Sequence, residues 1–149
     1  MLFLLFELDG DRYALESRQL IEVLPLVNLK PVPRAPHGIA GIFDYHGLPV
    51  PAVDLSEVIL GRAAQRRLST RMVIVNCPGT DDAPRKLGLI AEKATATVHL
   101  DTAQFSESGV SNGETPYLGP VARDAQGLIQ WLTVPQLLPP AVRSVLFQI

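Results

Sequence analysis

The chain has 149 residues, of which 47% are hydrophobic, and this is enough apolar material for one or two small cores. Thirteen Lys and Arg against fifteen Asp and Glu give a formal net charge of -2, which disfavours broad binding to a nucleic-acid backbone. The single cysteine, Cys77, excludes an intramolecular disulfide and a thiolate zinc cluster, and it favours a reducing compartment such as the cytoplasm.

The chain begins with an apolar segment that predicts a strand. Residues 1–6 lack the positive start of a secretory signal, and Glu7 follows before an apolar signal core would be complete. Residues 2–8 and 12–16 flank an Asp-Gly turn signal, which predicts an N-terminal hairpin. No later run approaches the roughly 20 apolar residues of a membrane helix, so we expect a soluble protein without direct membrane insertion.

Residues 19–24 form either a short helical turn or a strand, since Pro25 limits a helix there. The prolines at 31, 33 and 36 then predict an extended or irregular connector, because each fixes one backbone angle and removes one donor. A second hairpin is predicted from residues 41–45 and 48–53, which flank His46 and Gly47.

Asp54, with a glutamate three residues later, has capping-box spacing and predicts a short helix over residues 55–60. The next stretch holds four arginines and no acidic residue, and we interpret it as a solvated loop without chemistry: Arg62, Arg66, Arg67 and Arg71. Thr133 repeats the capping-box spacing and predicts a closing helix over Leu137 and Leu138.

Five more strands are predicted from β-branched or apolar runs, at residues 71–75, 87–91, 95–100, 117–122 and 128–132. Polar loops are expected at residues 79–84 and 106–116, the second of them mobile. Segments 43–59 and 122–138 share one plan of strand, turn, strand, cap and short helix, although the repeat is imperfect. Many short strands at regular spacing predict an all-β fold of barrels or sandwiches.

One segment matches the nucleophile motif of serine hydrolases. Gly109 to Gly113 reads G-x-S-x-G around Ser111, but that motif works on a turn between a strand and a helix. Here Pro116 follows closely and all three histidines precede the serine, against the usual chain order. A hydrolase that uses Ser111 is therefore an alternative rather than the leading hypothesis.

No metal or cofactor site is expected. His37, His46 and His99 could join Asp44 or Asp54 around a metal, but no ligand spacing places them on one face. No glycine-rich phosphate loop is present, and no catalytic residues are assigned. An OB-like barrel that binds nucleic acid is a further alternative, with a single tryptophan and an acidic balance against it. The sequence therefore favours an interaction surface over chemistry.

Several short motifs, in order and spacing, resemble one known family. They are residues 3–8 with 13–15, residues 20–23, residues 32–36 followed by 39–41, His46-Gly47 followed by residues 50–55, and residues 117–119 with 137–138. Together they resemble the CheW family, the adaptors of bacterial chemotaxis arrays that link receptors to the histidine kinase CheA. The resemblance spans nearly the whole chain.

The resemblance implies two SH3-like five-stranded β-barrels packed together, with short connecting helices, in one domain over residues 1–149 whose barrel strands interleave along the chain. It implies a non-enzymatic, cytoplasmic adaptor that couples a chemoreceptor to a CheA-like kinase at the membrane-associated receptor array. The partners would be the regulatory domain of the kinase, through Leu20 and Glu22, and the cytoplasmic hairpin of the receptor, through an apolar groove between the barrels. Pattern alone fits equally a core Leu20 beside a solvated Glu22.

One departure concerns the second hairpin, where the family has Asn-Leu-Arg-Gly and this chain has Asp44-Tyr45-His46-Gly47. Arginine keeps its charge and offers five donors, whereas histidine is smaller and mostly neutral at pH 7. The role of His46 and Gly47 therefore stays open. The chain is expected to be a divergent member, in a pathway that controls something other than swimming.

Overall fold

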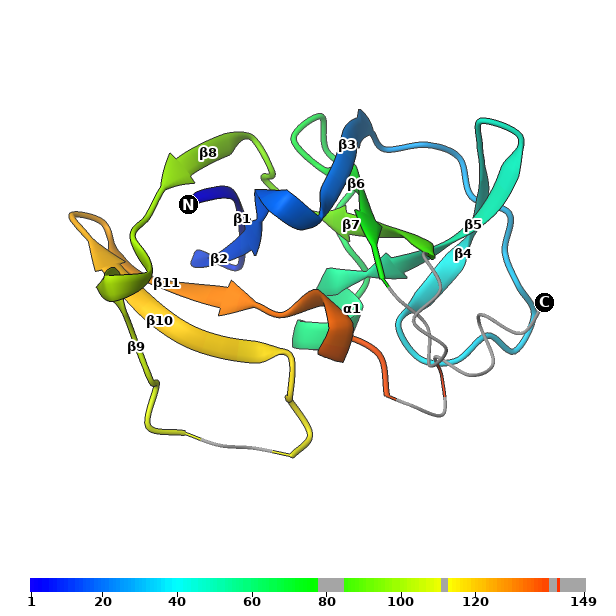
Figure 1. The fold of residues 1–149 in the computed structure, drawn as a ribbon. Coiled ribbons are helices and arrows are strands. Elements are labelled where there is room, and N and C mark those ends of the chain that lie inside the picture. The colour runs from blue at the N-terminus through cyan, green and yellow to red at the C-terminus, as the bar shows by residue number, and fades with distance from the viewer. Residues whose placement is uncertain (78–84, 111–112, 140–141, 143–149) are drawn as a thin grey trace.

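In a computed structural model, which describes residues 1–77, 85–110, 113–139 and 142, the chain forms two β-sheets (Figure 1). The six-stranded sheet has the order β8-β1-β2-β11-β10-β9 and the five-stranded sheet has the order β3-β6-β7-β5-β4. The first sheet consists of β1 (Leu2–Leu8), β2 (Asp11–Glu16), β8 (Ala96–His99), β9 (Phe105–Ser106), β10 (Leu118–Asp124) and β11 (Gly127–Leu132). The second consists of β3 (Leu20–Pro25), β4 (Ile39–Tyr45), β5 (Leu48–Asp54), β6 (Arg71–Asn76) and β7 (Lys86–Ala91).

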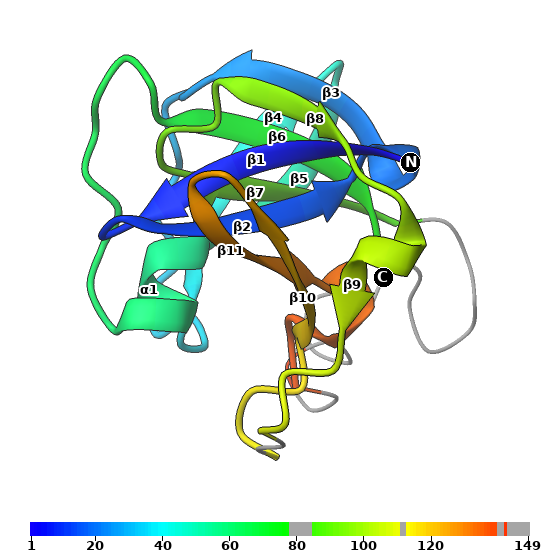
Figure 2. The same ribbon diagram turned by 90° about the vertical axis from the view of Figure 1, so that its left-hand side faces the viewer.

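The five-stranded sheet is inserted between the second and third strands of the six-stranded one. β1 and β2 pair first, β3 to β7 then build the other sheet, and β8 to β11 return to the first. In Figure 2, β1 lies between β8 and β2, its neighbours in the sheet. The predicted all-β fold of two small subdomains is confirmed, and the two-residue β9 gives one sheet a sixth strand.

Within the described residues, α1 (Leu55–Leu60) and the 3-10 helices Ser17–Gln19 and Thr102–Gln104 connect strands, and the 3-10 helix Val134–Gln136 follows β11. The segment left open between helix and strand contains both, because the first 3-10 helix leads directly into β3. The predicted loop at residues 79–84 lies outside the described residues.

The buried side chains of the described residues form three apolar clusters. The largest, here the central cluster, takes residues from both sheets: Leu4, Phe6, Leu8, Tyr13, Leu15, Val53, Leu55, Val73, Val75, Cys77, Leu87, Leu89, Ala91, Ala94, Tyr117, Leu132, Val134, Leu137 and Leu138. A second cluster lies within the five-stranded sheet and a third within the six-stranded sheet. Burial of the central cluster therefore holds the two sheets together.

Strand alternation divides these apolar residues between clusters. On β1, Phe6 points into the central cluster and Phe3 into the cluster of the six-stranded sheet. On β6, Val73 points into the central cluster and Ile74 into the cluster of the five-stranded sheet. Because successive side chains in a strand face opposite ways, both strands are buried on both faces. This explains their continuous apolar sequences.

The two edges of the five-stranded sheet are joined after β3. Lys30 and Ile42 form an isolated antiparallel bridge, with Lys30 N to Ile42 O at 2.8 Å and Ile42 N to Lys30 O at 2.9 Å. Gly41 lies beside this bridge with φ +152°, and a Cβ there would lie 2.6 Å from the Lys30 carbonyl oxygen. Only glycine allows the two backbones to approach this closely.

We expect Gly41→Ala to lower the free energy of unfolding by about 1–3 kcal/mol, because the new methyl group must displace backbone. Urea denaturation measures the change. Gly113→Ala is the matched control, since a Cβ at Gly113 meets nothing within 4 Å. An unchanged stability for Gly41→Ala would show that the bridge does not constrain the five-stranded sheet.

The predicted cap of α1 is confirmed. Asp54 Oδ1 accepts hydrogen bonds from Ser56 N at 3.0 Å and Glu57 N at 3.4 Å, and α1 ends at Gly61 in the left-handed conformation. Asp54 Oδ2 also accepts from Ala64 N at 2.8 Å, which holds the loop after the helix. The buried Asp54 therefore holds both the start of α1 and the loop that follows it.

The predicted cap at Thr133 is wrong. Its hydroxyl donates to the Tyr117 carbonyl oxygen at 2.9 Å instead of accepting from the following backbone. The closing helix is consequently reduced to the 3-10 turn Val134–Gln136. Leu137 and Leu138 follow it and are buried in the central cluster, so this segment contributes by packing.

An ion pair supports the parallel pairing of β2 with β11. Arg12 donates to both carboxylate oxygens of Asp124, at 2.5 Å and 2.9 Å, and also to the Gly127 carbonyl oxygen at 3.1 Å. The hydrogen bond from Arg12 lowers the pKa of Asp124 to about 2, from an ordinary 3.8. The charged form of Asp124 is therefore favoured by folding.

Because the folded pKa of Asp124 lies below the unfolded one, its contribution is complete above pH 4 or so and disappears as the pH falls towards 2. We expect wild type to be more stable than Asp124→Asn at pH 6, with the difference shrinking through this window. Urea midpoints at pH 6, 4, 3 and 2 provide the measurement. A difference that does not change with pH would contradict the assigned ion pair.

Candidate functional site

The residues with an expected binding role lie at one end of the five-stranded sheet. β3 and β4 are the two edge strands of that sheet, and Glu22 of β3 meets Tyr45 at the end of β4. Tyr45 Oη donates to Glu22 Oε2 at 2.6 Å, whereas His46 Nε2 lies 3.8 Å from the same oxygen. The Glu22 side chain is 42% exposed and therefore accessible to a partner.

The Leu20 side chain lies on a different face of β3 from the Glu22 side chain. A register shift between Leu20 and Glu22 in the pairing of β3 with β6 turns the two side chains to different surroundings. Leu20 is partly buried against the central cluster, and the exposed apolar residues of β3 are Ile21 (39%) and Val23 (41%). The structure thus brings Glu22 and His46 together and places Leu20 mainly on the core.

The turn between β4 and β5 fixes the position of His46. His46 and Gly47 have φ angles of 51° and 85°, the left-handed conformation of a two-residue hairpin turn. Gly47 N donates to Asp44 Oδ1 at 2.9 Å, which closes the turn. The His46 side chain is 76% exposed, and its ring meets the Tyr45 ring edge-on at 4.4 Å.

Sequence reasoning missed Tyr45 as a member of this site. Its hydrogen bond to Glu22, and then its burial, raise the pKa of the Tyr45 hydroxyl above its ordinary value of 10.0. The hydroxyl therefore stays protonated at neutral pH and acts as the donor. The Lys86 ammonium lies over the ring, 5.5 Å from its centre.

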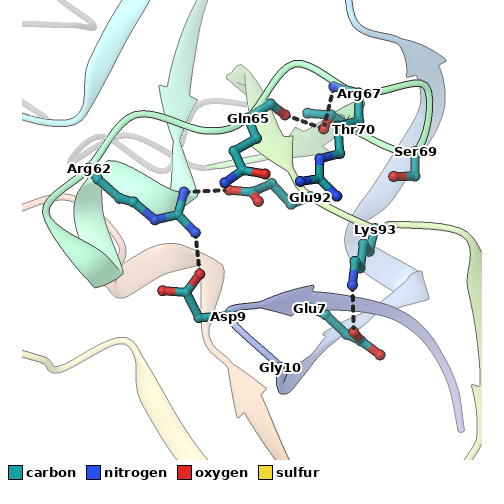
Figure 3. A pocket seen from close by; sticks show the side chains of 10 residues that line it. All are labelled: Glu7, Asp9, Gly10, Arg62, Gln65, Arg67, Ser69, Thr70, Glu92 and Lys93. Atoms are coloured by element: carbon teal, nitrogen blue, oxygen red, sulfur yellow. Dashed lines mark hydrogen bonds and ion pairs between the residues drawn. The ribbon is translucent and has the colours of Figure 1, made fainter.

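A polar cavity of about 200 Å³ lies where the two sheets approach each other (Figure 3). Arg62 donates to Asp9 in the β1–β2 turn at 2.5 Å and to Glu92 after β7 at 3.1 Å. Lys93 pairs with Glu7 at 3.6 Å. Arg62 is therefore not the solvated loop residue we predicted, because it links the six-stranded sheet to the five-stranded one.

The charges around this cavity cancel. Arg62, Arg67 and Lys93 contribute three positive charges, and three carboxylates balance them: Glu7, Asp9 and Glu92. The buried Glu92 also accepts a hydrogen bond from Ser56. With no excess charge to attract an ion, the cluster serves to connect the subdomains.

The alternatives that involve chemistry gain no support. Ser111, the residue proposed for a hydrolase, lies outside the described residues. His37 contacts Glu57 at 3.5 Å, His46 lies beside Glu22, and His99 lies on β8, so the histidines are on separate elements. The described part of the chain has no group of three or more His, Cys, Asp or Glu placed to hold a metal. It also has no helix with the length and apolar character needed to cross a membrane.

The fold is similar to that of a solved scaffolding protein. The crystal structure of scaffolding protein TtCheW from Thermoanaerobacter tengcongensis matches with a TM-score of 0.81 and 22% sequence identity, over 93% of this chain and 87% of that chain. This likeness defines the class of fold, two small packed β subdomains. The model of the CheW-like domain family matches residues 2–141, and the chain therefore belongs to the CheW family. No curated protein matches it significantly.

Family membership assigns the general role. The chain is a CheW-like scaffold of chemotaxis signalling, a role that implies protein partners. CheW-family proteins are non-enzymatic scaffolds, in agreement with the expectation that this chain is not an enzyme.

Proposed function

We propose that this chain couples a chemoreceptor to a CheA-like histidine kinase in the cytoplasm without transforming any molecule itself. The observation that supports this most strongly is the edge strand β3, which presents a half-exposed carboxylate between two exposed β-branched side chains, Ile21 and Val23. An apolar edge with one oriented charge suits binding to a protein surface.

The kinase contact is proposed to involve Leu20 and Glu22, the two positions that the family resemblance selects. Glu22 is accessible at the end of the sheet, and its charge would pair with a cation or donor of the kinase regulatory domain. Leu20 is partly buried, so only its outer part is available to a partner. Both residues belong to β3, so a partner that docks along this edge strand would contact Glu22 and the outer part of Leu20.

The receptor contact is proposed to lie between the two subdomains, in an apolar groove of the kind that the family resemblance implies, where the cytoplasmic hairpin of a chemoreceptor would dock. The central cluster and the Arg62 ion pairs fix the relative position of the sheets that would form its walls. Because the two sheets keep a fixed relative position, the bound receptor and the bound kinase would also keep a fixed relative position.

Binding to the kinase regulatory domain tests the proposed contact. We expect Leu20→Ala and Glu22→Ala each to weaken binding by about 1–2 kcal/mol, roughly 5- to 30-fold, measured by calorimetry. Leu128→Ala is the control, because Leu128 is exposed on β11 of the other sheet.

Thermal unfolding is measured alongside, since Leu20 packs against the central cluster. If Leu20→Ala lowers stability and the folded fraction binds with unchanged affinity, Leu20 is a core residue and its assignment fails. If Glu22→Ala also binds as wild type does, the kinase does not dock on β3.

A further inference from the structure

Glu22 and Tyr45 connect the two edge strands of the five-stranded sheet. β3 and β4 are its opposite edges, separated in the sheet order by β6, β7 and β5. The Tyr45 hydroxyl, at the end of β4, donates to Glu22 Oε2 of β3 at 2.6 Å. A hydrogen bond to a charged carboxylate is among the stronger ones in proteins. The side-chain position of Glu22 is thus tied to a residue 23 positions away in the chain.

Tyr45 is well suited to hold a flexible partner because it is itself fixed. The residue is only 7% exposed and belongs to the apolar cluster of the five-stranded sheet. Its ring meets the Phe43 ring edge-on at 6.4 Å. The other neighbour of Glu22, His46, lies at 3.8 Å, beyond hydrogen-bond distance, and its side chain is largely exposed.

We propose that Tyr45 is a positioning residue for the kinase contact, with its hydroxyl holding the Glu22 carboxylate in the orientation that the kinase regulatory domain binds. This inference rests on the proposed function. A free glutamate side chain samples several rotamers, and fixing one of them on binding costs free energy. Tyr45 fixes Glu22 before the partner arrives. It acts only through Glu22 and need not touch the kinase.

A tyrosine titration tests the Tyr45–Glu22 bond without any partner. The absorbance of tyrosinate is followed from pH 8 to 12.5, and the step of Tyr45 is obtained as the difference between each protein and its Tyr45→Phe version. Because the hydrogen bond to Glu22 raises the pKa of Tyr45, we expect Glu22→Ala to move this step to lower pH. Circular dichroism confirms that the fold persists. A step that stays in place in Glu22→Ala would overturn the inference.

A double-mutant cycle tests the consequence for binding. We expect Tyr45→Phe, which removes only the hydroxyl, to weaken binding of the kinase regulatory domain about 3- to 10-fold. In the Glu22→Ala background, Tyr45→Phe should not weaken binding further, because the carboxylate that the Tyr45 hydroxyl holds is already absent. Tyr117→Phe is the matched control, because the Tyr117 hydroxyl donates at 3.4 Å to the Val58 carbonyl oxygen beside the central cluster.

The outcomes separate this inference from the proposed function. If wild type binds and Tyr45→Phe has no effect, or has the same effect with and without Glu22, the positioning role is wrong and the adaptor function stands. If wild type does not bind a CheA-like regulatory domain at all, the proposed function fails and the positioning role fails with it.

Discussion

Truncating Phe6 to alanine is expected to lower the free energy of unfolding by about 3–5 kcal/mol, the usual cost of removing a large buried aromatic side chain. Phe6 is fully buried in the central cluster and stacks on Tyr13 with ring centres 5.4 Å apart. The cavity would open between the two sheets. Both subdomains would lose contacts, so one unfolding transition should shift as a whole.

Chemical denaturation followed by both tryptophan fluorescence and circular dichroism measures this effect. Trp131 reports on the six-stranded sheet, whereas circular dichroism reports on all strands. Leu2→Ala is the control, since Leu2 lies on the same strand and is exposed. Two separated transitions, with only one of them displaced by Phe6→Ala, would contradict the role of the central cluster.

Asp54→Ala is expected to cost about 2–4 kcal/mol, because it removes a helix cap and leaves buried backbone donors without an acceptor. The carboxylate accepts hydrogen bonds from Ser56, Glu57 and Ala64, and the residue is buried. Asp54→Asn should cost less than Asp54→Ala, since its amide oxygen can still accept from the first turn of α1.

Urea denaturation of the two variants provides the measurement, with Asp101→Ala as the matched control. Asp101 caps the 3-10 helix Thr102–Gln104 in the same way, accepting from Ala103 N at 3.1 Å, but it is exposed. We expect a loss of about 0.5–1 kcal/mol for the control. Equal losses for Asp54→Ala and Asp101→Ala would show that burial of the Asp54 cap adds nothing.

The sequence predicts the local elements of this fold well because their signals are local. Asp-Gly at residues 9–10 and His46-Gly47 mark the β1–β2 and β4–β5 hairpins, since these turns need left-handed backbone at fixed positions. The spacing of Asp54 to Glu57 predicts the start of α1. Thr133 has the same spacing and forms no cap, because its hydroxyl donates to the carbonyl oxygen of Tyr117, the residue before β10. Spacing indicates a possible cap, and the surroundings decide whether it forms.

The long-range arrangement could not be predicted from the residues alone. The parallel pairing of Ile129 with Arg12 returns the chain to its first hairpin, and no local pattern indicates it. The strand β1 was recognised, but a run that is apolar on both faces does not reveal which side chain enters which cluster. Two packed barrels followed from the family resemblance.

The candidate site, like the fold, could be predicted only in part. The resemblance selected Leu20 and Glu22 for the kinase contact and left the role of His46 open. In the structure Glu22 lies beside His46, and Leu20 is partly buried against the central cluster. Tyr45 was missed because its partner is on the opposite edge strand. Arg62 was read as solvated because Asp9 and Glu92 lie 53 and 30 residues away. Contacts between the opposite edges of a sheet, or between two subdomains, cannot be predicted from the spacing of residues in the sequence.

The central claim, that the chain joins two proteins, is tested most directly by the molar mass of a mixture. The chain is combined with a CheA-like regulatory domain and a chemoreceptor hairpin fragment, and the complex is measured by light scattering after size-exclusion chromatography. We predict a complex that contains all three components and does not form without the chain. Failure of the chain to bind either partner, or competition between the two for one surface, would contradict the account.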